Sequence, residues 1–168
     1  LTVEEAAKLQ FWIVDCITRE LSGREMLTRG DLGVVCGKNK PVITQKSESA
    51  IANIFGTEAC MLVRGAGSGA IRLGLHAILN SGDMILVHKA PIYDTTKTSL
   101  DMMGIYTAEA DFHDAGEIHK IMEEKPEIKA VLVQHTRQCP EDHYNLRNVI
   151  ETVKRVRPIP VLTDDNYA

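Results

Sequence analysis

The sequence predicts an α/β fold that is built on a mostly parallel sheet. From Glu58 onward, five short apolar segments alternate with helical segments, a pattern typical of strand–helix repeats. The apolar segments are continuous runs, as expected for parallel strands that are buried on both faces. The chain has 168 residues, about one domain by length, which is enough to bury a sizeable core.

The amino-terminal part of the chain lacks this alternation. Apolar side chains at helical spacing predict a helix from Thr2 to Leu21, and Thr2 with Glu5 is typical of a capping box at its start. Residues 26–41 contain three glycines, one proline and little periodicity, which indicates an irregular arm. A second helix is predicted over residues 44–55.

We therefore expect amino-terminal helices and an arm in residues 1–57, followed by the α/β part in residues 58–168. Apolar runs predict strands at residues 59–63, 84–87, 105–108, 130–134 and 160–163. Helical spacing predicts helices at residues 70–79, 91–103, 115–125 and 145–156. Because ligands of such sheets bind outside the carboxyl ends of the strands, functional residues are expected there.

The first predicted strand leads into a glycine-rich loop, Arg64-Gly65-Ala66-Gly67-Ser68-Gly69. Glycines let the backbone approach a ligand closely, and the following helix offers unpaired N–H groups to an anion such as a phosphate. A nucleoside triphosphate loop would carry a lysine that this loop lacks. A dinucleotide or S-adenosylmethionine site would need a carboxylate where the next strand ends in His88-Lys89. A small phosphorylated cofactor without a ribose meets neither objection, and a purely structural turn stays open.

Acidic and aromatic side chains follow two other predicted strands. Asp164 and Asp165 follow the fifth strand, and Tyr93 follows the second. A carboxylate there can accept a hydrogen bond from a protonated ring nitrogen, bind a metal or cap a turn. Pyridoxal phosphate needs an anion site, a stacking partner and an acid for its pyridinium nitrogen, so these strand tips are consistent with that cofactor.

On these motifs the chain resembles the first part of the fold-type I pyridoxal-phosphate enzymes, the superfamily of class V aminotransferases and of enzymes of cysteine and methionine metabolism. The resemblance covers nearly all of the chain and is carried by residues 25–33, 65–72, 131–138 and 162–168. It implies a three-layer α-β-α architecture. Residues 58–168 would form the first part of the large cofactor-binding domain, and the rest of that domain and the small domain would lie outside this sequence.

The resemblance also implies roles for single residues. The family's phosphate-binding loop falls on Ala66, Gly67 and Ser68, its ring-stacking aromatic on Tyr93 and its pyridinium partner on Asp164. These residues together would bind pyridoxal 5'-phosphate.

Further roles are expected nearby. Tyr167 matches an aromatic residue that follows the family's aspartate, and Gln138 takes the place of an asparagine that contacts the cofactor's ring hydroxyl. His135 and Arg137 are expected to contact the substrate, and a structural salt bridge of Arg137 is the alternative. The family's Schiff-base lysine lies on a later segment, so the catalytic lysine is expected beyond Ala168.

The implied function is that of a pyridoxal-phosphate-dependent transferase or lyase. Such an enzyme, aminotransferase-like or eliminating at the β or γ carbon, would act on a small amino acid through an aldimine and a ring-stabilised carbanion. The resemblance also implies a homodimer with the site at the subunit interface. Two alternatives stay open: a domain that binds S-adenosylmethionine or a nucleotide, and a non-catalytic module of the same fold.

Composition and charge argue against several other classes of function. A net charge of −4 argues against nucleic-acid binding. The sequence has neither an apolar run of membrane-spanning length nor a basic leader, so a cytoplasmic protein is expected. The four cysteines form no C-x-x-C pair and are expected to be free thiols. His113, Asp114 and His119 lack convincing ligand spacing, so no metal site is expected.

Overall fold

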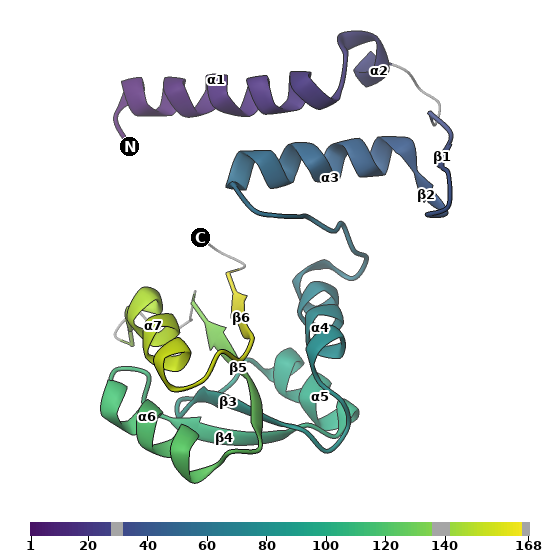
Figure 1. The fold of residues 1–168 in the computed structure, drawn as a ribbon. Helices are drawn as coiled ribbons and strands as arrows, with labels where there is room; N and C mark the ends of the chain where they lie inside the picture. The colour runs from purple at the N-terminus through teal and green to yellow at the C-terminus, as the bar shows by residue number, and fades with distance from the viewer. Residues whose placement is uncertain (28–31, 136–141, 166–168) are drawn as a thin grey trace. The chain divides into compact units, whose positions relative to one another are not determined.

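The computed structural model describes residues 1–27, 32–135 and 142–165 (Figure 1). The chain divides into two compact units, residues 1–62 and residues 63–168. No helix in the described ranges is both long enough and apolar enough to cross a membrane.

Two long helices dominate the first unit. Helix α1 (Val3–Glu20) begins with the predicted capping box: the Glu5 N–H donates to Thr2 Oγ1 at 3.2 Å, and the Thr2 N–H donates to the Glu5 carboxylate at 2.7 Å. Helix α3 (Val42–Phe55) ends at Gly56, whose φ of 63° supplies the left-handed conformation that favours glycine. Both predicted helices are confirmed.

The segment between these helices was expected to be an irregular arm. In its described part it carries short ordered elements instead: a helix, α2 (Gly23–Leu27), and an antiparallel pair of two-residue strands, β1 (Val34–Val35) and β2 (Lys40–Pro41). The hairpin turn contains Gly37 at a φ of 75°, a left-handed conformation that favours glycine.

The second unit contains the predicted parallel sheet, with four strands in the order β4-β3-β5-β6. The strands are β3 (Met84–His88), β4 (Tyr106–Ala110), β5 (Ile128–Gln134) and β6 (Val161–Asp164). The helices are α4 (Ala66–Ile78), α5 (Asp94–Met103), α6 (Ala115–Glu124) and α7 (Leu146–Val156). The α/β class is confirmed.

Two hydrophobic cores lie on opposite faces of this sheet. Successive side chains of a strand point to opposite faces, and Ile85 packs with Leu75 of α4 and Leu100 of α5. Its neighbour Leu86 packs with Ile118 of α6 and Val149 of α7. The sheet is therefore the middle of three layers, with α4 and α5 on one face and α6 and α7 on the other (Figure 1).

One predicted strand is wrong. Residues 59–63 form no strand in the structure, and Met61 and Leu62 are exposed to 66% and 52%. An apolar run becomes a strand only when another strand pairs with it, and none of the described strands does so. Instead the Leu62 N–H donates to the carboxylate of Glu48 at 2.9 Å.

Candidate active site

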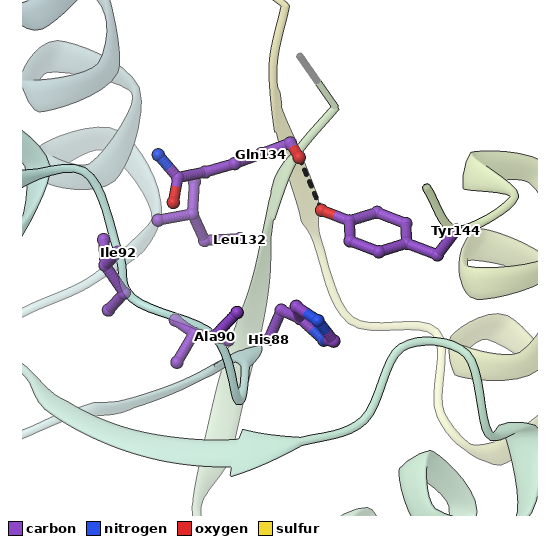
Figure 2. Close-up of a pocket in the computed structure, with 7 residues that line it drawn as sticks. His88, Ala90, Ile92, Leu132, Gln134 and Tyr144 are labelled. Carbon is purple, nitrogen blue, oxygen red and sulfur yellow. Dashed lines mark hydrogen bonds between the residues drawn. The ribbon is translucent and has the colours of Figure 1, made fainter. Parts of the chain in front are cut away.

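The strand order has a switch point between the two inner strands, β3 and β5. The connection that follows β3 leads to β4 on one side, whereas the connection that follows β5 leads to β6 on the other. Ligands of open α/β sheets bind at such a switch point, outside the carboxyl ends of the strands. A small pocket lies there (Figure 2). It is lined by Val87, His88, Ala90, Ile92, Leu132, Gln134 and Tyr144.

The glycine-rich loop forms the amino-terminal end of α4. Gly65 (φ 97°) and Ala66 (φ 53°) both adopt positive φ, and the first intrahelical bond runs from the Gly69 N–H to the Gly65 carbonyl at 2.9 Å. No side chain among the described residues caps this end of the helix. The N–H groups of residues 66–68 precede that first bond and have no acceptor within the helix. These are the groups that would donate hydrogen bonds to an anion.

Gly69 makes this turn possible. A Cβ atom at Gly69 would lie 2.2 Å from the carbonyl oxygen of Arg64, far inside van der Waals contact. The backbone of Arg64 therefore passes directly over the start of α4, where a side chain at residue 69 would block it.

The first turn of α5 lies beside this loop. Ser68 Oγ donates to Thr95 Oγ1 at 3.2 Å, which joins the start of α4 to the start of α5. The Tyr93 carbonyl accepts from the N–H groups of Thr96 and Lys97, each at 2.9 Å, so Tyr93 begins this helix. The Tyr93 side chain is 46% exposed, so much of the ring is accessible to a ligand.

The two acids at the end of β6 have different surroundings. Asp164 is the last residue of β6, is half-buried and pairs in register with Gln134 of β5. Asp165 is exposed, and its Oδ1 lies 2.8 Å from Nδ1 of His135. The His135 N–H donates to the Asp164 carbonyl at 2.9 Å. The side chain of Asp165 thus contacts His135, and Asp164 ends the strand at the carboxyl end of the sheet.

Of the residues expected in the site, those described by the structure lie at the carboxyl edge of the sheet or at the helix ends beside it. They are Ala66, Gly67, Ser68, Tyr93, His135 and Asp164. Arg137, Gln138 and Tyr167 lie outside the described residues. Gln134 and Tyr144 were not among the expected site residues, because nothing in the sequence brings residue 144 back to the end of β5. The Tyr144 hydroxyl donates to the Gln134 carbonyl at 2.5 Å (Figure 2).

The histidines and acids near β3 and β4 are arranged differently from the sequence expectation. Asp114 caps α6 by accepting from the N–H groups of Gly116 and Glu117, and His119 faces Glu123 at 3.3 Å. Instead, Asp142 Oδ1 lies 3.4 Å from His88 Nε2 and 3.3 Å from His113 Nε2. These three residues are close enough for their ligand atoms to surround one ion.

The hydrogen bonding of His88 disfavours metal binding by this cluster. The main-chain N–H of Phe112 donates to His88 Nδ1 at 2.9 Å. Since a neutral imidazole has one acceptor nitrogen, Nε2 carries the ring hydrogen and offers no lone pair to an ion. The cluster therefore acts as a set of polar contacts that hold Asp142 near the tips of β3 and β4.

A second ion pair borders the cluster. Lys89 Nζ lies 2.5 Å from Asp111 Oδ2, and His113 Nδ1 lies 2.8 Å from Asp111 Oδ1. The hydrogen bond from Lys89, followed by those from His113, holds the pKa of the Asp111 carboxyl well below its usual range. The same bond raises the pKa of Lys89. Asp111 is therefore ionised near neutral pH and binds Lys89 beside the end of β3.

Comparison with known proteins finds one similar curated protein and many similar structures. No family model matches the chain. The chain is 46% identical, over all of its 168 residues, to an uncharacterised Escherichia coli protein, YhfS, and spans 46% of the length of that protein. The crystal structure of YhfS, described as a pyridoxal-5'-phosphate-dependent protein, superposes on the whole chain with a TM-score of 0.91.

More distant structures share the fold alone. An O-acetylhomoserine sulfhydrylase from Wolinella succinogenes is 18% identical and has a TM-score of 0.60 over 71% of this chain and 34% of its own. A cystathionine gamma synthase from Xanthomonas oryzae is 18% identical and has a TM-score of 0.65 over 90% of this chain and 43% of its own. The fold expected from the resemblance is thereby confirmed: the chain has the fold of the fold-type I pyridoxal-phosphate-dependent proteins.

Proposed function

We propose that this chain binds pyridoxal 5'-phosphate and belongs to a transferase or lyase that acts on a small amino acid. The observation that carries the proposal is the start of α4, where no described side chain caps the first N–H groups and the absence of a side chain at Gly69 leaves room for the Arg64 carbonyl. The 46% identity with a pyridoxal-5'-phosphate-dependent protein supports the same cofactor.

The start of α4 would bind the cofactor's phosphate. The N–H groups of Ala66, Gly67 and Ser68 would donate to its oxygens, because no described side chain already caps them. The positive end of the helix dipole would favour the phosphate charge. The Ser68 hydroxyl, beside Thr95, would supply one more hydrogen-bonding group.

Two side chains would hold the ring. The half-exposed ring of Tyr93 would stack on the face of the pyridine, and the carboxylate of Asp164 would accept a hydrogen bond from the ring nitrogen. The family resemblance assigns this role to Asp164, which ends β6 at the carboxyl end of the sheet. When bound, the protonated pyridine ring accepts the electrons that are released as a bond at the substrate's α-carbon breaks.

The remaining assignments follow from the family resemblance. We propose that Gln138 and Tyr167 contact the cofactor, that His135 and Arg137 face the substrate, and that the Schiff-base lysine lies outside these 168 residues. We also propose a cytoplasmic homodimer with the site at the subunit interface. Transamination and elimination at the β or γ carbon both fit this arrangement.

Absorbance spectroscopy of the full-length protein with added pyridoxal phosphate tests the proposal. We expect a visible band that borohydride bleaches, with the cofactor fixed covalently to a lysine. Asp164→Asn should weaken cofactor binding about tenfold to a hundredfold, because it removes a hydrogen bond to a charged group. Asp165→Asn is the matched control and should change the affinity less than about threefold.

A wild-type protein without the band would contradict the proposal. Binding of S-adenosylmethionine in its place would then favour the alternative of an adenosyl-ligand domain. Equal losses of cofactor affinity in Asp164→Asn and Asp165→Asn would overturn only the role given to Asp164, not the proposed cofactor.

A further inference from the structure

Gln134 lines the pocket at the carboxyl ends of the strands, yet none of the roles proposed above falls to it. It is the last residue of β5 and pairs in register with Asp164 of β6. Leu132, two residues earlier and thus on the same face of the sheet, packs in the core with Leu75 and Leu100. The side chain of Gln134 therefore points to the face on which α4 and α5 lie.

Hydrogen bonds hold Gln134 at two points. Its side-chain oxygen, Oε1, accepts the main-chain N–H of Tyr93 at 3.2 Å. Its main-chain carbonyl accepts the hydroxyl of Tyr144 at 2.5 Å. Figure 2 shows the amide of Gln134 on the side of Ile92, while Tyr144 approaches the main chain from the other side.

The orientation of the amide is fixed by this chemistry. A main-chain N–H only donates, so the side-chain atom that faces Tyr93 is the oxygen. The bond spans 41 residues of sequence and joins the tip of β5 to the start of α5.

Tyr93 lies in a connecting segment between β3 and α5. Residues 91–93 belong to neither β3 nor α5, and Tyr93 itself has non-helical dihedrals (φ −56°, ψ 132°). Its N–H precedes the first turn of α5 and takes no part in the helix. With nearly half of the side chain exposed, packing alone restrains the phenol ring weakly.

We propose that Gln134 is a positioning residue for Tyr93: by accepting the Tyr93 N–H, it sets where the phenol ring lies over the bound cofactor. The inference rests on the proposed function, because it takes the ring of Tyr93 as the stacking partner. Tyr144 supports the role by fixing the main chain of Gln134 on the opposite side.

Amide hydrogen exchange in the full-length apoprotein tests the positioning directly. Gln134→Leu removes the acceptor and should speed exchange in the segment of residues 90–97 about threefold to tenfold. Gln134→Glu keeps an oxygen acceptor and should exchange like the wild type. Lys129→Leu, an exposed position on the same strand, is the control for an added leucine and should also leave the segment unchanged.

A double-mutant cycle tests whether Gln134 acts through the ring. Gln134→Leu should weaken pyridoxal-phosphate binding about threefold to tenfold in the wild-type background. In the Tyr93→Ala background, which keeps the N–H but lacks the ring, it should weaken binding less than about twofold.

An equal loss of affinity in both backgrounds would overturn the inference, because Gln134 would then act on the cofactor directly. Unchanged exchange at residues 90–97 in Gln134→Leu would overturn it as well. A wild-type protein that fails to bind the cofactor would instead contradict the proposed function, while the exchange experiment would still decide whether Gln134 holds Tyr93.

Discussion

At the residue scale, Gly69 is the position in the loop that least tolerates a side chain. Gly69→Ala would place a Cβ 2.2 Å from the Arg64 carbonyl oxygen, and backbone cannot yield as a flexible side chain does. We expect a loss of about 1–3 kcal/mol in the free energy of unfolding. Cofactor affinity should fall at least about tenfold, since the start of α4 must shift. Urea unfolding and a pyridoxal-phosphate titration measure the two effects.

Gly23→Ala is the matched control, since a Cβ there meets nothing within 4 Å. It should change the free energy of unfolding by less than about 0.5 kcal/mol. An equally mild effect of Gly69→Ala would show that the loop opens easily, and would contradict its description as a closely packed turn.

At the element scale, Glu48 joins segments that are distant in the sequence. Its Oε2 lies 2.5 Å from Nζ of Lys40 in β2, and its Oε1 accepts the Leu62 N–H. The bond from Lys40, followed by that from Leu62, lowers the pKa of this buried carboxyl below its ordinary value of 4.5. A lowered pKa in the folded state stabilises the fold above pH 4.5, and this stabilisation is lost as the pH falls through the lowered value.

Glu48→Gln should therefore reduce the free energy of unfolding at pH 7 by about 1–3 kcal/mol. The difference from the wild type should shrink as the pH falls below about 4.5. Urea unfolding between pH 7 and pH 3 measures both, with the exposed Glu58→Gln as control. A difference that is independent of pH would show that charge plays no part in the contribution of Glu48.

The elements also show what a sequence can predict here. Helices α1, α3, α6 and α7 were predicted to within a few residues, because local spacing and capping groups determine them. The segment at residues 59–63 was predicted wrongly, because an apolar run does not reveal whether a partner strand exists. The roles of the loop, Tyr93 and Asp164 were predicted from motifs and stay predictions. Gln134 and Tyr144 were missed, because their contacts join residues that only the folded chain brings together.

At the scale of the whole molecule, the two units differ in how much they bury. Among the described residues of 1–62, five are buried: Cys16, Leu21, Glu48, Ala50 and Ala52. The second unit holds both hydrophobic cores. Its inner strands β3 and β5 are each paired on both sides, whereas β4 and β6 each have one partner among the described strands.

Amide hydrogen exchange should follow this difference in the 168-residue chain. Opening β3 or β5 breaks two ladders of hydrogen bonds and exposes both cores, so their amides should exchange slowest. The free energy of opening at these amides should approach the global free energy of unfolding. Amides of α1 and α3 should exchange faster, because few buried contacts are lost when these helices open. Mass spectrometry of peptic peptides measures exchange in the strands and in the helices in one sample. If α1 or α3 proved as protected as β5, the two units would unfold as one cooperative body, and burial within each unit would not set its stability.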